Sequence, residues 1–111
     1  MPTMQTLIFQ PGPLPITQTF NFEGDGDVII SLSGSAWAND AGMLAFELFM
    51  DNNAVGFAYR YTNEGGSHKT LVPMLFPWQL GFGEHTITLA VEIGSPTITD
   101  QNDYFNVALI Y

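Results

Sequence analysis

Carboxylate side chains gather in short turn-like segments, where their oxygens are close enough in sequence to bind a cation. Glu23, Asp25 and Asp27 form one such segment, and Asp100 with Asp103 forms another. Calcium takes about six to eight oxygen ligands from carboxylates and carbonyls. The sequence therefore makes a calcium site a candidate, with ligands drawn from Asp25, Asp27, Asp51, Asp100 and Asp103.

The first acidic segment does not complete the calcium loop of an EF-hand. Counting from Glu23, the sixth position holds Val28 where that loop needs glycine, and the twelfth holds Gly34 where it needs glutamate. Aspartate, asparagine and glycine are also ordinary turn residues, and charged loops keep a β-rich protein soluble. We therefore expect no obligatory cofactor, and calcium is the candidate ion.

Aromatic side chains with a polar tip offer flat apolar faces on which sugar rings can stack. Trp37, Tyr59 and Tyr61 are the predicted glycan contacts. Trp37 is the best placed, because Ile30 and Leu32 occupy one face of its strand and Trp37 falls on the other. Tryptophan and tyrosine also fill cores and subunit interfaces, which is the alternative for all three.

No group of residues has the spacing of a known catalytic motif. His68 and His85 stand seventeen positions apart and do not supply the clustered histidines of a cupin, and there is no Gly-x-Ser-x-Gly elbow. The segment Gly24-Asp25-Gly26 lacks the third glycine and the following helix of a nucleotide-binding loop. We expect structural or surface roles for both histidines and no enzymatic activity.

The charge of the chain excludes several partners. Eleven acidic residues are balanced only by Arg60 and Lys69, so the formal net charge is −9 at pH 7. Such a surface repels phosphate backbones and anionic membranes, and we expect no nucleic-acid binding. The longest apolar stretch, residues 41–50, is short and contains Glu47, so no membrane insertion is expected. No signal peptide is visible in residues 1–5.

Short alternating runs of apolar and polar residues define the secondary structure. In residues 86–93 every second side chain is large and apolar, as a strand with one buried face requires. Pro11, Pro13 and Pro15 prevent regular ladder pairing, so residues 10–15 are expected to be an extended connector after an edge strand at 6–9. Further strands are predicted at 16–22, 28–37, 44–50, 54–61, 70–78, 86–93, 97–99 and 104–111.

This pattern predicts an all-β fold, an antiparallel β-sandwich with jelly-roll topology of about 8–10 strands. Residues 1–15 would form the N-terminal edge strand and proline-rich connector, and residues 16–111 the sandwich domain. If each strand from residue 16 onward reverses direction, the loops at 23–27, 51–53, 79–85 and 100–103 share one end. That end would hold seven of the eleven acids, with Arg60, His68 and Lys69 toward the other.

Two segments near the C-terminus carry a family resemblance. They are Gly83-Glu84-His85-Thr86-Ile87-Thr88-Leu89 and Asn102-Asp103-Tyr104-Phe105-Asn106-Val107. With the strand pattern, they resemble the closing strands of bacterial and phage jelly-roll heads of the tumour necrosis factor and complement globular-head superfamily. The resemblance implies a homotrimer that binds receptors, glycans or particle surfaces, in an extracellular, virion or cell-surface location. This chain departs from the family in having no collagen-like or coiled-coil stalk.

Low charge and two strands with apolar residues on both faces favour an oligomer, because a lone sandwich would expose much apolar surface. The predicted interface comprises Met74, Phe76, Trp78, Phe105, Val107, Leu109 and Tyr111. We expect a non-catalytic trimeric head that recognises a glycan or receptor, or that serves as the structural head of a fibre or surface assembly. The alternatives are a monomeric carbohydrate-binding module and a capsid or particle subunit.

Overall fold

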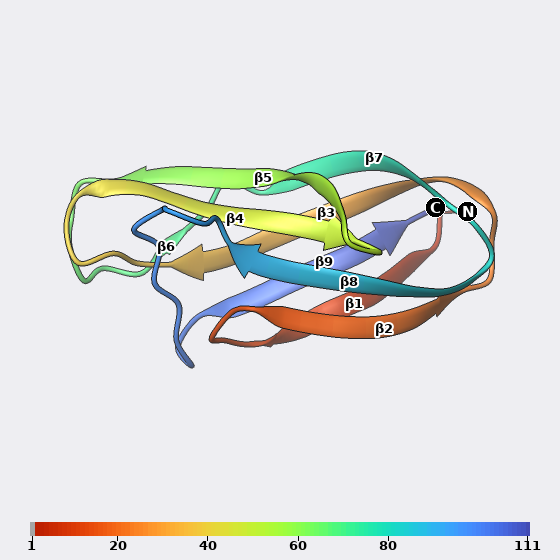
Figure 1. Ribbon diagram of the computed structural model, residues 1–111, viewed down its shortest axis with the longest axis horizontal. Helices are drawn as coiled ribbons and strands as arrows, with labels where there is room; N and C mark the ends of the chain where they lie inside the picture. Colours follow the sequence, from red (N-terminus) through yellow and green to blue (C-terminus); the bar gives the residue numbers. More distant parts are fainter. Residues whose placement is uncertain (1) are drawn as a thin grey trace.

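The computed structural model describes residues 2–111, so Met1 of the predicted N-terminal segment lies outside the described residues. The strands are β1 (Met4–Pro11), β2 (Ile16–Phe22), β3 (Gly26–Ala36), β4 (Gly42–Met50), β5 (Asn53–Thr62), β6 (Lys69–Thr70), β7 (Met74–Leu80), β8 (Gly83–Val91) and β9 (Tyr104–Ile110) (Figure 1). Residues 2–111 contain no helix, and hence none long and apolar enough to cross a membrane.

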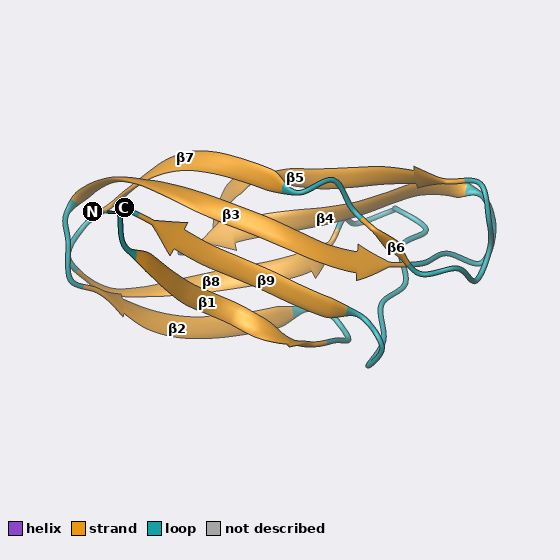
Figure 2. Cartoon of the chain, turned by 180° about the vertical axis from the view of Figure 1, so that it is seen from behind, coloured by secondary structure: helices purple, strands orange, loops and turns teal. Residues whose placement is uncertain are grey.

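The strands form two antiparallel sheets that pack face to face (Figures 1 and 2). One sheet has the order β1-β9-β3, and β7 and β6 both pair with the remaining edge of β3; the other sheet has the order β2-β8-β4-β5. Most connections cross from one sheet to the other, as in a jelly roll. The fold is therefore an all-β jelly-roll sandwich, which confirms the predicted fold class.

The core lies between the sheets and is filled by alternate residues of the strands. Val28, Ile30 and Leu32 of β3 are buried there, and the residues between them, Ile29 and Ser31, lie on the opposite face and are half-buried. The rings of Phe46 and Phe105 meet edge to face at the centre, with centroids 5.5 Å apart. Each buried side chain of this size stabilises the fold by about 1.5–3 kcal/mol. The period of two in the sequence is thus the main determinant of the sandwich.

The strand predicted at 70–78 is interrupted, so its prediction as one continuous strand is wrong. β6 ends at Thr70 and β7 begins at Met74, with Pro73 between them. Proline has no N–H to give to a ladder. In the break, the N–H of Leu71 donates to Gly34 in β3 (2.9 Å), whereas that of Val72 donates to Tyr59 in β5 (3.2 Å). The interruption therefore links the edges of the two sheets.

Residues 97–99 form no strand, which corrects a second prediction. Ile98 makes a single bridge to Trp37. The backbone nitrogen of Ile98 lies 2.7 Å from the carbonyl oxygen of Trp37, and the nitrogen of Trp37 lies 2.9 Å from the carbonyl oxygen of Ile98. Beside it, the hydroxyl of Thr97 accepts the N–H of Ala45 (2.8 Å). Because this segment does not reverse the chain, the loop that follows it lies at the opposite end of the sandwich from the one predicted.

The molecule is elongated (Figure 1), and its two ends differ in charge. One end has the β2–β3 and β7–β8 connections and the β4–β5 hairpin, and it carries five acids: Glu23, Asp25, Asp27, Asp51 and Glu84. Asp100 and Asp103 lie toward the other end, where His68 contacts both. The prediction that seven acids share one end is therefore wrong for these two residues.

The chain ends lie side by side because β1 and β9 pair along their length. The N–H of Tyr111 donates to the carbonyl of Thr3 (2.9 Å), and the N–H of Thr3 donates back to Tyr111. In Figure 2 both termini emerge at the end that also carries the β7–β8 connection. β9 is thus a central strand, between β1 and β3.

Most residues predicted to line a subunit interface face into the protomer. Phe105, Val107 and Leu109 are fully buried in the core, so their assignment to an interface between folded copies is wrong. Met74, Phe76 and Trp78 pack against that core from β7, and Tyr111 is partly exposed at the end of the sandwich. Neighbouring side chains on a strand point to opposite faces, so the outward positions are the alternate ones, Leu75, Pro77, Tyr104 and Asn106.

Candidate functional site

An open cleft of about 1100 Å³ lies at the end of the sandwich where the termini emerge. Its walls come from the start of β3, the ends of β7 and β9, the β4–β5 hairpin and the start of β8. The polar and aromatic lining residues include Asp27, Asn53, Trp78, Gln79 and Tyr111, among apolar side chains such as Met50 and Leu80. A concave site with an apolar lining and a few polar groups is the usual form of a small-ligand site.

An aspartate–histidine pair holds one wall of the cleft. Oδ2 of Asp51 lies 2.6 Å from Nδ1 of His85, and Nε2 of His85 lies 2.7 Å from the carbonyl oxygen of Gly81. Both partners accept hydrogen bonds, so the imidazolium form of His85, with a proton on each ring nitrogen, satisfies both contacts. Partial burial lowers the pKa of His85, but the bonds to Asp51 and Gly81 and the charge of Asp51 outweigh it and raise the pKa.

The local sequence explains why Asp51 reaches this position. Met50 pairs with Asn53, which leaves Asp51 and Asn52 as a two-residue turn with φ angles of 52° and 66°. A type I′ hairpin turn needs positive φ at both central residues, and aspartate and asparagine tolerate it better than most side chains. Oδ1 of Asp51 then accepts the N–H of Thr86 (2.8 Å), which ties the hairpin to β8.

Asp27 and Gln79 form another part of the lining. They pair across β3 and β7, and Nε2 of Gln79 donates to Oδ1 of Asp27 (3.0 Å). Both side chains are exposed, and within residues 2–111 no cation lies within ion-pair distance of Asp27. The cleft therefore offers an uncompensated carboxylate, two amides and two aromatic rings. Such a lining can bind a ligand that has apolar faces and several hydroxyl or amine donors.

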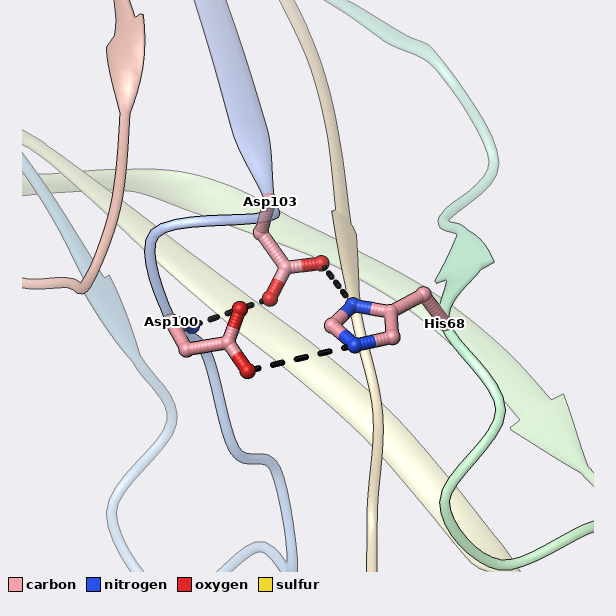
Figure 3. Close-up of side chains that lie close together, drawn as sticks. All are labelled: His68, Asp100 and Asp103. Atoms are coloured by element: carbon pink, nitrogen blue, oxygen red, sulfur yellow. Dashed lines mark hydrogen bonds and ion pairs between the residues drawn. The ribbon is translucent and has the colours of Figure 1, made fainter.

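His68, Asp100 and Asp103 form a second polar cluster (Figure 3). It lies toward the other end of the sandwich, in the β5–β6 and β8–β9 connections. Nδ1 of His68 is 2.7 Å from Oδ1 of Asp103, and Nε2 is 3.9 Å from Oδ2 of Asp100. The buried carboxylate of Asp103 also accepts the hydroxyl of Ser35 (2.7 Å) and the N–H of Asp100 (3.0 Å). The bond to Asp103, aided by both carboxylate charges and opposed by slight burial, raises the pKa of His68.

The same three residues each place one metal-ligand atom within 4.8 Å of the others. However, Asp103 already accepts hydrogen bonds from protein donors. A metal ion would then have only Nε2 of His68 and an oxygen of Asp100, compared with about four ligands in a structural zinc site. The hydrogen bonds of the cluster join the β5–β6 connection to the β8–β9 connection. This agrees with the structural role predicted for His68.

Trp37, the leading predicted glycan contact, belongs to this second cluster and not to the cleft. Its Nε1–H donates to Oδ2 of Asp100 (3.2 Å), and its ring centroid lies 5.9 Å from that of His68. The side chain is half-buried. A sugar platform centred on Trp37 remains a prediction.

The other two predicted glycan contacts, Tyr59 and Tyr61, are exposed on the outer face of β5. The ring of Tyr59 stacks on that of Phe57, with centroids 5.8 Å apart. Partial burial, followed by the charges of Glu92 and Glu47, raises the pKa of Tyr59. The predicted contacts therefore fall on two separate surfaces, and neither surface includes the cleft.

The five aspartates predicted as calcium ligands do not come together. Asp25, Asp27 and Asp51 lie at the cleft end, whereas Asp100 and Asp103 lie with His68. Both oxygens of Asp51 have partners within the chain, as do both oxygens of Asp103. A single calcium site built from the five is therefore wrong. The error follows from the strand predicted at 97–99, which assigned the last two aspartates to the wrong end.

No family model matches the chain, and no curated protein matches it. Dimeric latent PorU from Porphyromonas gingivalis has a TM-score of 0.63 at 11% sequence identity, over 98% of this chain and 12% of PorU. The CBM36-1 domain of a multidomain xylanase from the hindgut metagenome of Trinervitermes trinervoides has a TM-score of 0.53 at 14% identity, over 100% of this chain and 97% of that domain. At these identities the likeness concerns the fold.

A third similar structure is the C-terminal domain of EclA, described as a sugar-binding protein. Its TM-score is 0.52 at 11% identity, over 100% of this chain and 79% of that one. The chain thus spans most of the two carbohydrate-related structures but a small part of PorU. The shared architecture is the jelly-roll β-sandwich.

Sequence reasoning did not identify the cleft, although it placed three of its loops correctly. The loops at 23–27, 51–53 and 79–85 lie at one end, as the count of reversing strands predicted. Asp27 and Gln79 meet only through the pairing of β3 with β7. A usable signal was the Asp51-Asn52 pair between two apolar runs, because it is typical of a tight hairpin turn.

Proposed function

We propose that this chain is a non-catalytic carbohydrate-binding module that takes its ligand in the cleft between the β4–β5 hairpin and β7. The observation that carries the proposal is the lining of the cleft, where Trp78 and Tyr111 accompany Asp27, Asn53 and Gln79. Aromatic faces contact the C–H faces of a sugar, while carboxylate and amide groups bind its hydroxyls. The jelly-roll likeness to a xylanase CBM36-1 domain and to a sugar-binding domain of EclA supports the same class.

The arrangement of the acids supports a non-catalytic role. Glycoside hydrolysis ordinarily uses two carboxyl groups that flank the scissile bond, one of them able to give a proton. Here Asp51 is occupied by His85 and by the N–H of Thr86, so Asp27 is the one lining carboxylate with an uncommitted oxygen in the described cleft. A single carboxylate can orient a sugar but does not form such a pair.

The test is titration of the full chain with soluble neutral oligosaccharides, followed by calorimetry and by protein NMR shifts. Gln79→Ala removes an exposed amide from the cleft and should weaken binding about five- to tenfold, since a lost hydrogen bond is worth about 1 kcal/mol. Gln101→Ala, in the exposed turn before β9, is the matched control and should leave affinity unchanged. Absence of binding to every oligosaccharide at millimolar concentration would contradict the proposal.

The Trp37→Ala variant separates the two candidate sugar surfaces. If the cleft is the site, this variant should bind as the parent chain does, because Trp37 lies at the far end of β3. Loss of binding in Trp37→Ala, with Gln79→Ala unaffected, would assign the sugar to the surface predicted from the sequence instead.

A second candidate function is that of a self-associating head. We propose that it forms the homotrimer through a different surface from the one predicted from the sequence. The outward side of the β1-β9-β3-β7 sheet exposes Met4, Phe9, Leu75 and Tyr104. Strands β1, β7 and β9 contain no charged residue, although the chain carries a net charge of −9. Copies with like charge can approach most closely on a face with so few charges, where the exposed acid of β3 is Asp27 at its start.

Sedimentation of the full chain at micromolar concentration tests this second candidate. A trimer that Leu75→Glu dissociates, and that Ile93→Glu in an exposed turn does not, would support an interface on this sheet. A monomer in the parent chain would exclude the trimeric head and leave the binding module.

A further inference from the structure

The cleft end of the molecule has a one-sided charge. Five carboxylates lie there, on Glu23, Asp25, Asp27, Asp51 and Glu84. Both strong bases are elsewhere: Arg60 donates to the carbonyl of Thr70 (3.0 Å), and Lys69 lies 3.5 Å from Glu64. His85 is the basic group of the cleft lining. A concave site surrounded by charge of one sign focuses the field at its mouth.

The two lining carboxylates differ in what compensates them. The carboxylate of Asp51 lies 2.6 Å from the ring of His85, which balances its charge when the ring is protonated. Asp27 has only the neutral amide of Gln79, at 3.0 Å on one oxygen. Asp27 therefore has no cationic partner among the described residues and keeps a second oxygen that can accept from a ligand. In the described lining it is the residue suited to bind a cationic group.

We infer that the cleft selects sugars that carry a protonated amine, such as glucosamine oligomers, over their N-acetylated and acidic counterparts. This inference rests on the proposed function. An ammonium group presents three donors and a charge to Asp27, whereas N-acetylation removes the charge and adds bulk. A uronic acid brings a carboxylate into a field of the same sign and is repelled.

The contribution of Asp27 to this preference can be tested separately from that of the apolar surface of the cleft. Trp78 and Tyr111 line the cleft as aromatic residues that can contact a sugar whatever its charge. Asp27→Asn keeps the size of the side chain and its oxygen acceptor but removes the charge. The variant should therefore lose the preference for the amine while it still binds neutral oligosaccharides.

The experiment compares glucosamine, N-acetylglucosamine and galacturonate oligomers of equal length with neutral xylo-oligosaccharides. Calorimetry is done at mildly acidic pH, where the amine is protonated, and at low and high salt. We expect glucosamine oligomers to bind about tenfold more tightly than the N-acetylated ones, as a charge-assisted hydrogen bond predicts. The difference should shrink in high salt and in Asp27→Asn. Asp40→Asn, an exposed acid of the β3–β4 turn, is the control for net charge.

The outcomes separate this inference from the proposed function. Equal binding of the amino and N-acetylated oligomers would overturn the inference, and so would an Asp40→Asn variant that loses the amine preference as much as Asp27→Asn does. In either case, binding of neutral sugars would still support the proposed carbohydrate-binding module. If no sugar of any class binds, both proposals fall. An amine preference that Asp27→Asn abolishes and Asp40→Asn preserves would establish Asp27 as the residue that determines specificity.

Discussion

Asp103 and His68, thirty-five positions apart, are joined by a 2.7 Å contact between Oδ1 and Nδ1. Asp103 has no exposed surface, whereas the side chain of His68 is partly open to solvent. The buried carboxylate also holds Ser35 and the N–H of Asp100. One side chain thus anchors β3, the β5–β6 connection and the β8–β9 connection.

The first prediction follows from that anchor. Asp103→Ala leaves the hydroxyl of Ser35 and the N–H of Asp100 without their acceptor, and an unsatisfied buried donor costs about 1–3 kcal/mol. We expect the free energy of unfolding to fall by about 2–4 kcal/mol, measured by urea denaturation. Asp40→Ala, in the exposed β3–β4 turn, should change it by less than about 0.5 kcal/mol. Equal effects of the two substitutions would show that the anchor contributes little.

The second prediction concerns pH. The pKa values of His68 and His85 are raised above the ordinary 6.5, so each histidine binds its proton more tightly in the folded chain. Their stabilisation is therefore complete below pH 6.5 and is lost as the pH rises through the folded pKa values. We expect Tm to fall as the pH increases above 6.5. In a His68→Gln, His85→Gln variant the fall should be much smaller, and an unchanged slope would contradict the assignment.

The third prediction tests the packing at the centre of the sandwich. A Cβ at Gly34 would lie 2.6 Å from Cδ1 of Phe105 and 3.0 Å from Cε2 of Phe46. Both rings are buried against each other and have little room to move. Gly34→Ala should therefore destabilise the fold by about 1–3 kcal/mol, as overpacking does. Gly81→Ala, where an added Cβ meets nothing within 4 Å, is the control; thermal unfolding of both distinguishes a steric clash from a general effect of alanine.

The fourth prediction concerns the hairpin beside the cleft. Asn52 has a φ of 66°, a value that glycine adopts more readily and alanine less readily than asparagine. Asn52→Gly should leave Tm unchanged or slightly higher, whereas Asn52→Ala should lower stability by about 1 kcal/mol. If both variants melt alike, the turn does not constrain the hairpin as described.

The sequence predicts most of the strands because their determinant is local. Residues 16–22 correspond to β2, and the predicted strands at 44–50 and 54–61 lie within β4 and β5. In such segments the alternation of apolar and polar residues predicts alternating burial directly. The predicted strand at 70–78 fails at Pro73, which removes a ladder donor.

The site was less accessible to sequence reasoning because its residues are distant along the chain. Asp27 and Gln79 are fifty-two positions apart and meet through sheet pairing. His85 acquires its role only when Asp51 and Gly81 are brought to either side of its ring. The interface prediction failed for Phe105, Val107 and Leu109 for a related reason. Alternation shows that two faces differ, but in a strand that is apolar on both faces it does not show which one is inward.

The pairing of Thr3 with Tyr111 has a practical consequence for any assay of this molecule. Because Tyr111 lines the cleft, a tag, fusion or surface linker attached at either terminus would emerge next to the mouth of the cleft. Immobilisation through the exposed turn at residues 63–66 instead would orient the opening toward the solution. Ligand binding can be compared on a biosensor for the two attachment geometries. Weaker binding when the chain is attached through a terminus would show, by steric occlusion alone, that the ligand enters at that end of the sandwich.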